Sequence, residues 1–462
     1  MTVPSARELA LKVLKGVEER DAYADILLDH WLNRHQLLPR ERALATEIAF
    51  GTLRRRNTLD WVIEGFSSRP IVKMDLWTRN ILRLGAYQLL YLERIPARAA
   101  VDEAVKLARR FAPYGVSGFV NAVLRRVANG RLPPFPSLAE DPLTHLSLNY
   151  SHPRWLVERW LTQLGWEGTA ALCQANNQPP PVTLRVNRLK STPAEAREAL
   201  AAARIEVGTG NYLPEALVVR KAGSPERLPG YAEGWFSLQD ESSMLVAHAL
   251  DPQPGEMVVD MASAPGGKTT HLAEVMGNLG NIVAADVHEH RLSSVRERAH
   301  RLGIRIIRTM VADGRQLADL YAGQADRVLL DAPCSGLGVL RRNPEARWRK
   351  RPQDIPGLVR LQMELLAAGA QLLKPEGTLV YSTCTITPEE NQGVVEGFLK
   401  RHPDFAREDL RPFLPEGLHK VPQVDEGWIQ LYPHLHGTDG FFLARLRKGK
   451  TGGSKEPLVA RR

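Results

Sequence analysis

Two of the three cysteines in this 462-residue chain stand where a thiol could react. Cys334 follows the apolar run RVLLDAP and Cys384 follows TLVYST, at points where buried strands would end. A free cysteine is most often a small buried hydrophobic residue. Two cysteines at one expected ligand edge instead suggest thiolate chemistry, because thiolate addition to C6 of a pyrimidine makes C5 nucleophilic enough to accept a methyl group.

A glycine-rich turn, DMASAPGGKTTH (260–271), follows another apolar run and would let a ligand approach the backbone closely. Gly267, Lys268 and Thr269 look like the end of a nucleoside-triphosphate loop, but the glycine required five residues before Gly267 is Ala262. The dinucleotide fingerprint G-x-G-x-x-G is also missing. The turn therefore fits neither a triphosphate loop nor an ordinary NAD site.

Acidic residues end three further apolar runs. Asp286 lies about 20 residues beyond the glycines, where a carboxylate accepts hydrogen bonds from ribose hydroxyls. Asp313 could hydrogen-bond an adenine edge, and Asp331 could serve N3 and N4 of a cytosine while Lys268 assists with its charge. A single such acid could be a structural cap, but three in succession predict a nucleoside cofactor such as S-adenosylmethionine.

The elements that must position these residues differ along the chain. Residues 5–129 carry apolar residues at helical spacing, which predicts an all-helical domain. The proline-rich segment 130–142 is typical of a linker, and a tryptophan-bearing helix over 150–166 and a strand over 182–189 predict a small α+β domain. From about residue 235, short apolar runs alternate with helical segments, which predicts a doubly wound, Rossmann-like α/β domain with its ligands at the carboxyl ends of the strands.

We therefore divide the chain into a helical domain at 1–135, a linker and small α+β domain at 136–234, a Rossmann-like domain at 235–446 and a basic tail at 447–462. The chain has 61 Lys or Arg against 52 Asp or Glu, and the excess is uneven. The helical domain holds 22 basic against 14 acidic residues, and the tail six against one. This pattern favours a polyanionic partner such as RNA.

The segment RRNPEARWRKR (341–351), directly after the Cys334 motif, is also rich in basic residues. It could be a solvated surface loop or contact RNA phosphates, and both interpretations stay open. Three cysteines do not suggest a disulfide framework, and we find neither a secretion signal nor an apolar run long enough for a membrane span. We expect a cytoplasmic monomer that binds no metal ion and no membrane, with Cys173 in a structural role.

Several motifs resemble one family. DMASAPGGKTTH, LLDAPCSGLG and LVYSTCTITPEEN are closely similar to motifs of the RsmB/NOP family of RNA cytosine-5 methyltransferases, which includes the bacterial Fmu/Sun enzymes of 16S rRNA. The segments at 82–110 and 119–126 resemble the NusB-like domain of these bacterial proteins, and HGTDGFFLARL (436–446) resembles their last strand. The resemblance covers nearly the whole chain except the basic tail.

The resemblance implies an enzyme that uses S-adenosylmethionine, with Cys384 as nucleophile and Cys334 in product release. Spacing alone does not decide which cysteine attacks. The implied catalytic residues are Cys384, Cys334, Asp331 and Lys268. The implied cofactor contacts are Ala262, Ser263, Ala264, Pro265, Gly266, Gly267, Lys268, Asp286, Asp313 and Asp331. Many relatives have a cysteine where this chain has Ala262, a departure from which we expect no mechanistic consequence.

The leading hypothesis is methylation of C5 of a cytosine in small-subunit rRNA. One alternative is a cytosine-5 methyltransferase of tRNA or another RNA, which the NusB-like segment disfavours. Another is a noncatalytic RNA-binding assembly factor that keeps a methyltransferase fold, which the intact Cys334, Cys384, Asp331 and Lys268 disfavour. Because C6 is hidden in a stacked helix, the target cytosine should be unpaired or flipped out.

Overall fold

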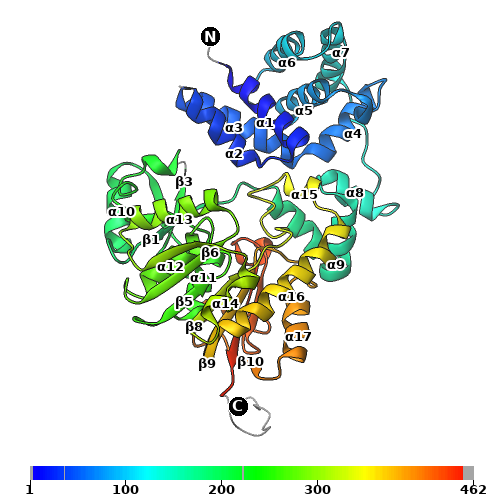
Figure 1. The fold of residues 1–462 in the computed structure, drawn as a ribbon. Coiled ribbons are helices and arrows are strands. Elements are labelled where there is room, and N and C mark those ends of the chain that lie inside the picture. The colour runs from blue at the N-terminus through cyan, green and yellow to red at the C-terminus, as the bar shows by residue number, and fades with distance from the viewer. Residues whose placement is uncertain (1–3, 36, 221–222, 451–462) are drawn as a thin grey trace. The chain divides into compact units, whose positions relative to one another are not determined.

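The computed structural model describes residues 4–35, 37–220 and 223–450, and its contacts divide the chain into two compact units (Figure 1). The first unit comprises Met1–Pro179 with Leu340–Lys350, and the second comprises Pro180–Val339 with Arg351–Arg462. The two units are defined by which residues contact one another in the structure. The domain boundaries at residues 135, 234 and 446 were placed from sequence composition, and they stay a prediction. Most of the basic tail lies outside the described residues.

The first unit is all-helical, as the apolar spacing predicts. Its core is a single cluster to which the fully buried Leu9, Ile48, Leu82 and Leu124 contribute. The helices that surround this core are α1 (Ala6–Arg20), α2 (Ala24–Arg34), α3 (Pro39–Arg54), α4 (Arg56–Phe66), α5 (Leu76–Tyr91), α6 (Ala97–Phe111) and α7 (Val116–Asn129), with a 3₁₀ turn at Ile71–Lys73.

Two further helices, α8 (Pro142–Asn149) and α9 (Arg154–Asn176), belong to the same unit. Residues 131–137 before them form neither helix nor strand, as their proline content predicts. Helix α9 is broken at Gly165, whose φ of 65° and ψ of −169° are open to glycine at little cost. The predicted tryptophan helix therefore corresponds to the first half of α9, with Trp160 in the interior at 1% exposure.

The basic segment after the Cys334 motif packs into the first unit, where it forms the short helix α15 (Ala346–Arg349). The Trp348 indole donates to the Leu53 carbonyl over 2.8 Å. Arg347 has no exposed surface, and its guanidinium donates over 2.9–3.4 Å to the backbone oxygens of Arg54, Ser151, Asn176 and Leu340 and to Oδ1 of Asn177.

This burial excludes both interpretations for Arg347, which lies neither in a solvated loop nor where a phosphate could reach it. The physical reason is helix termination. The last carbonyls of a helix have no partner within it, and a cation is favoured at that end. Arg347 and Trp348 supply the missing donors at the ends of α3 and α9. Lys350 is partly exposed and Arg351 is exposed, so phosphate contact stays a prediction for that end of the segment.

The second unit begins with a small antiparallel sheet in the order β2-β3-β1-β4, which confirms the predicted α+β part. Leu184, Val186, Leu200 and Phe236 form its fully buried core. The elements are β1 (Val182–Val186), α10 (Pro193–Ala202), β2 (Glu206–Thr209), β3 (Ala216–Arg220) and β4 (Phe236–Leu238).

The large sheet of the second unit has the order β10-β12-β9-β8-β5-β6-β7, with β11 paired to β12. The five strands predicted from apolar runs are parallel, and β12 and β10 add an antiparallel edge. The strands are β5 (Met257–Asp260), β6 (Asn281–Asp286), β7 (Ile307–Val311), β8 (Ala325–Asp331), β9 (Leu373–Thr383), β10 (Phe405–Arg407), β11 (Trp428–Leu431) and β12 (Phe441–Lys448).

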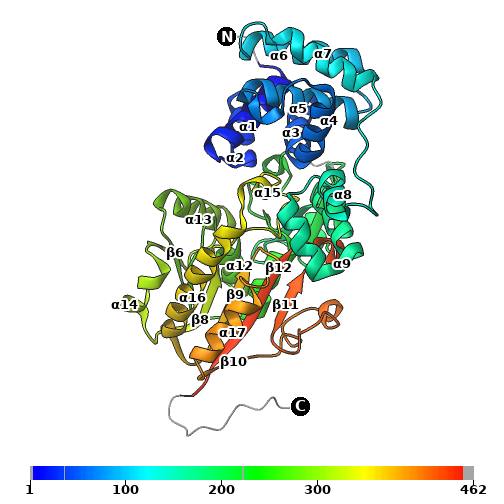
Figure 2. The same ribbon diagram turned by 90° about the vertical axis from the view of Figure 1, so that its right-hand side faces the viewer.

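Both faces of this sheet are buried, which explains why its strands have nearly continuous apolar sequences. Val258 and Val259 are adjacent in β5 but belong to different core clusters. One cluster includes residues of α11 (Glu241–Leu250), α12 (Gly267–Val275) and α13 (Glu289–Leu302). The other includes residues of α14 (Ala318–Tyr321), α16 (Ile355–Leu372) and α17 (Gln392–Arg401), the last two of which lie side by side (Figure 2).

The order of the parallel strands reverses between β5 and β8. In open α/β sheets such a switch point opens a crevice at the carboxyl ends of the strands, where ligands bind. The turn after Asp260 and the loop after Asp331 therefore flank the expected ligand site. Within the described ranges, no helix is both long and apolar enough to cross a membrane.

The role of Arg347 can be tested by substitution. Arg347→Ala should destabilise the first unit by about 3 kcal/mol, because several buried carbonyls lose their donor and a cavity is left. Urea denaturation followed by tryptophan fluorescence measures the change. Arg109→Ala, at an exposed position on α6, is the matched control. An effect of Arg347→Ala as small as that of the control would contradict the assigned role.

Candidate active site

The structure brings the two predicted reactive cysteines together. In the parallel pair β8–β9, Asp331 stands opposite Ser382, so the loops after both strands begin at the same edge of the sheet. Cys334 and Cys384 follow by three and two residues, and their Sγ atoms lie 3.4 Å apart. Both cysteine residues are partly exposed.

Backbone hydrogen bonds hold the loop after Cys334 against the loop that contains Cys384. The Gly338 N–H donates to the Cys384 carbonyl over 3.0 Å, and the Gly440 N–H donates to the Gly338 carbonyl over 2.9 Å. A Cβ atom on Gly338 would clash with the carbonyl group of Gly440. Glycine is therefore required at this crossing for close approach rather than for a special φ angle.

A fully buried carboxylate, Glu390, joins the same two loops. It accepts hydrogen bonds from the Ser335 N–H at 2.8 Å and from the Ser335 hydroxyl at 2.5 Å. The Gln362 amide also donates to it over 3.1 Å, and the hydroxyl of Ser335 contacts that of Thr385 at 2.7 Å. The sequence interpretation missed these residues, although Glu390 stands in the motif TCTITPEEN directly after Cys384.

An ion pair lies beside the thiols. Lys268 Nζ is 2.8 Å from Asp331 Oδ2, and the Ser382 hydroxyl donates to Asp331 Oδ1 over 2.8 Å. Burial acts to lower the pKa of Lys268, but the charges of Asp331 and Cys384 outweigh it and raise that pKa. Lys268 therefore keeps its positive charge, which also lies 5.1 Å from the centre of the Phe441 ring.

The two cysteines differ electrostatically. The hydrogen bond with Cys384 and burial together raise the pKa of the Cys334 thiol well above its usual value. Cys334 is therefore a neutral thiol at neutral pH. Cys384 lies within electrostatic reach of the positively charged Lys268. Sequence spacing alone could not distinguish the two.

The glycine-rich turn from Ala262 to Lys268 leads from β5 into α12. Gly266 has a φ of 97°, and a Cβ there would lie 3.0 Å from Val295 Cα, so the turn needs glycine at this position. Ser263 is buried, and its hydroxyl has no hydrogen-bond partner in the described part of the chain. A buried polar atom of this kind suits a polar ligand, so the turn fits a nucleoside cofactor.

The other two predicted cofactor residues lie at neighbouring strand ends. Asp286, at the end of β6, is buried and accepts the His288 N–H at Oδ1 over 2.9 Å, while its Oδ2 lies 3.6 Å from the guanidinium of Arg291. Asp313 follows β7 and is bound by the guanidinium of Arg315, with a shortest contact of 2.6 Å. That contact lowers the pKa of Asp313. An adenine edge would have to share Asp313 with Arg315.

A buried arginine from the small sheet holds the start of α12. Arg185, in β1, has no exposed surface and donates to the Gly267 carbonyl over 2.7 Å. It also pairs with Glu274 at 2.7 Å, and it donates to the Thr270 hydroxyl over 3.1 Å. The sequence analysis did not identify this role of Arg185, because no local pattern connects residues so far apart in the chain.

The fold is that of an S-adenosylmethionine-dependent methyltransferase. The family model described as 16S rRNA methyltransferase RsmB/F matches residues 247–447. The NusB family model matches residues 4–129, and the ferredoxin-like domain model of RsmF/B-like methyltransferases matches residues 152–225. The chain belongs to the RsmB/F family of 16S rRNA methyltransferases.

Individual proteins are similar to this chain over almost its full length. The chain is 41% identical, over 97% of its length and 100% of the relative, to the probable ribosomal RNA small subunit methyltransferase B of Bacillus subtilis strain 168. It is 42% identical, over 96% of its length and 99% of the relative, to the protein of the same name from Synechocystis. A crystal structure of a protein called PH0851 matches with a TM-score of 0.84 and 30% identity, over 97% of this chain and 100% of that one.

Asp260, next to the cofactor turn, should make the stability of the protein depend on pH. Burial raises the pKa of Asp260 to about 7. The hydrogen bond that the Thr269 hydroxyl donates to it over 2.7 Å acts to lower this pKa, but burial has the larger effect. A raised carboxyl pKa means that the folded protein holds the proton longer than the unfolded protein. Stability is therefore lost as the pH rises from about 4 to about 7, by up to about 4 kcal/mol.

Asp260→Asn should remove this loss, because the amide does not ionise. The free energy of unfolding of the variant, relative to the wild type, should therefore become more favourable as the pH rises from 5 to 8, as measured by urea denaturation. Asp404→Asn, at an exposed position, should show no such trend. A constant difference between Asp260→Asn and the wild type over this pH range would contradict the raised pKa.

Proposed function

We propose that this protein methylates C5 of a cytosine in small-subunit rRNA through a transient covalent bond between Cys384 and C6. The observation that carries the proposal is the 3.4 Å contact of the two thiols beside the Lys268–Asp331 ion pair. The names of the relatives, which are small-subunit rRNA methyltransferases, support rRNA as the substrate. Three free cysteines without a disulfide are in keeping with a reducing cytoplasm.

In this mechanism Cys384 starts the reaction. The sulfur lone pair of its thiolate forms a bond to C6, and the C5–C6 π electrons move to C5 and into the ring. Lys268 stabilises the thiolate beforehand. Asp331, held by Lys268 and Ser382, accepts a hydrogen bond from the cytosine N4 amino group. When this carboxyl group holds a proton, it can pass the proton to N3 as negative charge develops there.

S-adenosylmethionine supplies a methyl group on a positively charged sulfur, which the electron-rich C5 can attack. The C5 proton then passes to a water molecule that acts as the base, and its electrons restore the C5–C6 double bond while Cys384 departs as a thiolate. Cys334 lies against the departing sulfur and carries a proton at neutral pH, so its thiol can hydrogen-bond to the leaving Cys384. This arrangement supports the implied role of Cys334 in product release.

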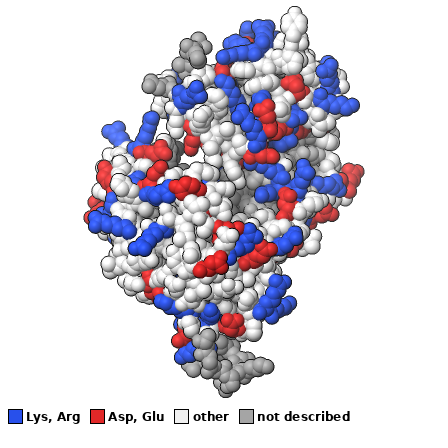
Figure 3. Space-filling view, viewed as in Figure 1, with Lys and Arg blue, Asp and Glu red and all other residues white. Residues whose placement is uncertain are grey.

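The helical unit would supply RNA affinity. Residues 1–135 carry 22 basic against 14 acidic residues. On the face drawn in Figure 3, Lys and Arg side chains are interspersed with Asp and Glu rather than gathered in one continuous patch. We therefore expect contacts to the phosphate backbone at several separate points, and these give affinity without base specificity.

Cys384→Ala should abolish methyl transfer while binding of RNA and S-adenosylmethionine is largely kept, because only the nucleophile is lost. Bisulfite sequencing of rRNA from a deletion strain that carries the wild-type or the variant gene measures the modification. The wild-type gene should restore one methylated cytosine and the variant none. Methylation restored by Cys384→Ala would refute the nucleophile assignment.

A modified site in tRNA instead of rRNA would favour the alternative substrate. The absence of any modified site with the wild-type gene would favour a noncatalytic factor.

Cys334→Ala should act at the other end of the reaction. If Cys334 assists release, this variant should accumulate protein covalently joined to RNA, seen as a slowly migrating band on a denaturing gel. The double variant Cys334→Ala/Cys384→Ala should lack the band, because it cannot form the bond. Absence of the band in Cys334→Ala, under conditions in which the wild type is active, would contradict a release role.

A further inference from the structure

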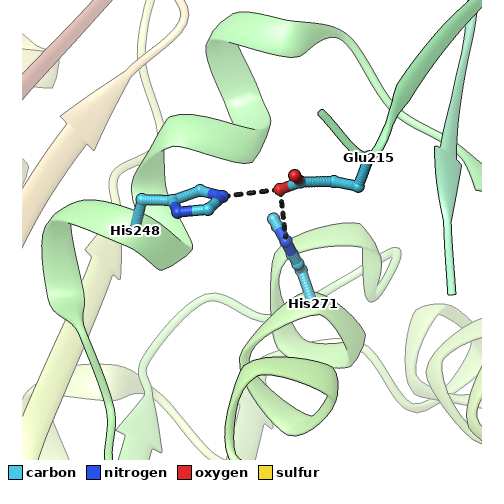
Figure 4. A group of neighbouring side chains, drawn as sticks. All are labelled: Glu215, His248 and His271. Atoms are coloured by element: carbon cyan, nitrogen blue, oxygen red, sulfur yellow. Dashed lines mark hydrogen bonds and ion pairs between the residues drawn. The ribbon is translucent and has the colours of Figure 1, made fainter. Parts of the chain in front are cut away.

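A second cluster of ionisable side chains lies in the second unit, apart from the thiols. Glu215 directly precedes β3, His248 lies in α11 and His271 lies in α12. Glu215 Oε1 is 2.6 Å from His248 Nε2 and 3.7 Å from His271 Nε2. Figure 4 shows both imidazole rings directed at this carboxylate, and one ligand atom from each residue lies within 4.8 Å of the others.

The cluster has unused bonding capacity. Glu215 and His271 are 2% and 3% exposed. Glu215 Oε2 and His271 Nδ1 are buried, and neither has a hydrogen-bond partner among the residues that the structure describes. Buried polar atoms are normally paired, so unpaired atoms on two adjoining side chains point to a missing ligand.

The protonation states suit a cation. Burial, with the charge of Arg185, lowers the pKa of His271 to about 3, so this imidazole is neutral and has a free lone pair. Burial acts to raise the pKa of Glu215, but its hydrogen bond with His248 outweighs this and leaves that pKa well below its usual value. A neutral imidazole and an ionised carboxylate are the forms that bind metal ions.

The cluster also borders open space. Glu215, His248 and His271 line a cavity of about 650 Å³, whose other walls include Arg188 and Phe413. The nearby Glu274 is held by Arg185 at 2.7 Å and is therefore not a free ligand. The available donors are two imidazoles and one carboxylate, with room for water on the cavity side.

Against the expectation from the sequence that no metal ion binds, we propose that Glu215, His248 and His271 bind one Zn²⁺ ion, with water from the cavity as the fourth ligand. Zn²⁺ prefers four ligands drawn from imidazole, carboxylate and thiolate, at about 2.0–2.2 Å for nitrogen and oxygen. Ca²⁺ and Mg²⁺ prefer sets made of oxygen atoms, which this cluster does not offer. Binding would replace the hydrogen bond between His248 and Glu215, and a neutral His248 would then carry its ring proton on the nitrogen that faces away from the ion.

The ion would join three elements. It would tie the start of β3, in the small sheet, to α11 and α12 of the large domain. His271 lies about one turn after Lys268 in α12, so occupancy should also stiffen the helix that carries the cofactor turn. This role is structural and does not depend on the methyl transfer reaction.

The test uses the full-length protein after treatment with a chelator. Titration with Co²⁺, followed by visible absorption, should show one site with the spectrum of a cobalt ion bound by nitrogen and oxygen. Zn²⁺ should displace the cobalt, and isothermal titration calorimetry should give one ion per chain. The Cys334→Ser/Cys384→Ser variant should bind equally well, because the thiols take no part.

His248→Gln and Glu215→Gln should each weaken Zn²⁺ binding by more than the roughly 10- to 100-fold typical of losing an outer-shell partner. His248 is partly exposed, so His248→Gln should fold normally, which far-UV circular dichroism checks. His300→Ala, at an exposed position on α13, is the matched control and should bind as the wild type does. The proposal is overturned if the wild type binds no Zn²⁺, if folded His248→Gln binds it unchanged, or if the double cysteine variant loses it.

Discussion

The pairing of β8 with β9 is the constraint on which the rest of the site depends. Asp331 opposite Ser382 sets the points at which the two strands end, and the thiols of the following loops then meet at 3.4 Å. A slip of one residue would turn each side chain to the other face of the sheet. Burial of both faces makes such a slip costly, so the apolar core of the domain also fixes the geometry of its chemistry.

Three buried polar side chains hold the functional segments in place. Glu390 connects the cysteine loops, Arg185 holds the first turn of α12, and Arg347 anchors the segment that follows the Cys334 motif into the helical unit. Each of these side chains forms hydrogen bonds with several backbone or side-chain groups, because a buried charge is tolerated only where its hydrogen-bonding groups have partners. Chain segments that carry chemistry are thus held by polar contacts rather than by apolar packing alone.

Helix α12 is the element shared by the cofactor turn, the ion pair beside the thiols and the histidine cluster. Its first turn carries Lys268, which pairs with Asp331, and its backbone accepts a hydrogen bond from Arg185. About one turn later His271 joins Glu215 and His248. The cofactor turn, the ion pair beside the thiols and the histidine cluster therefore respond to the position of one helix, so a change at one site can reach the others through a rigid element.

The sequence by itself determined the helical domain, the five parallel strands and the set of residues at their ends, because helical spacing, buried strands and glycine turns are local signals. It also identified Cys334, Cys384, Asp331 and Lys268 as a group. Tertiary structure alone decided which partners they have. Arg347 looked like a surface cation until its carbonyl partners were known. Glu390 stood in a recognised motif without an assigned partner, and nothing local marked Arg185. The histidine cluster comes from three separate elements, and only folding brings its members together, since long-range contacts leave no periodic trace in the sequence.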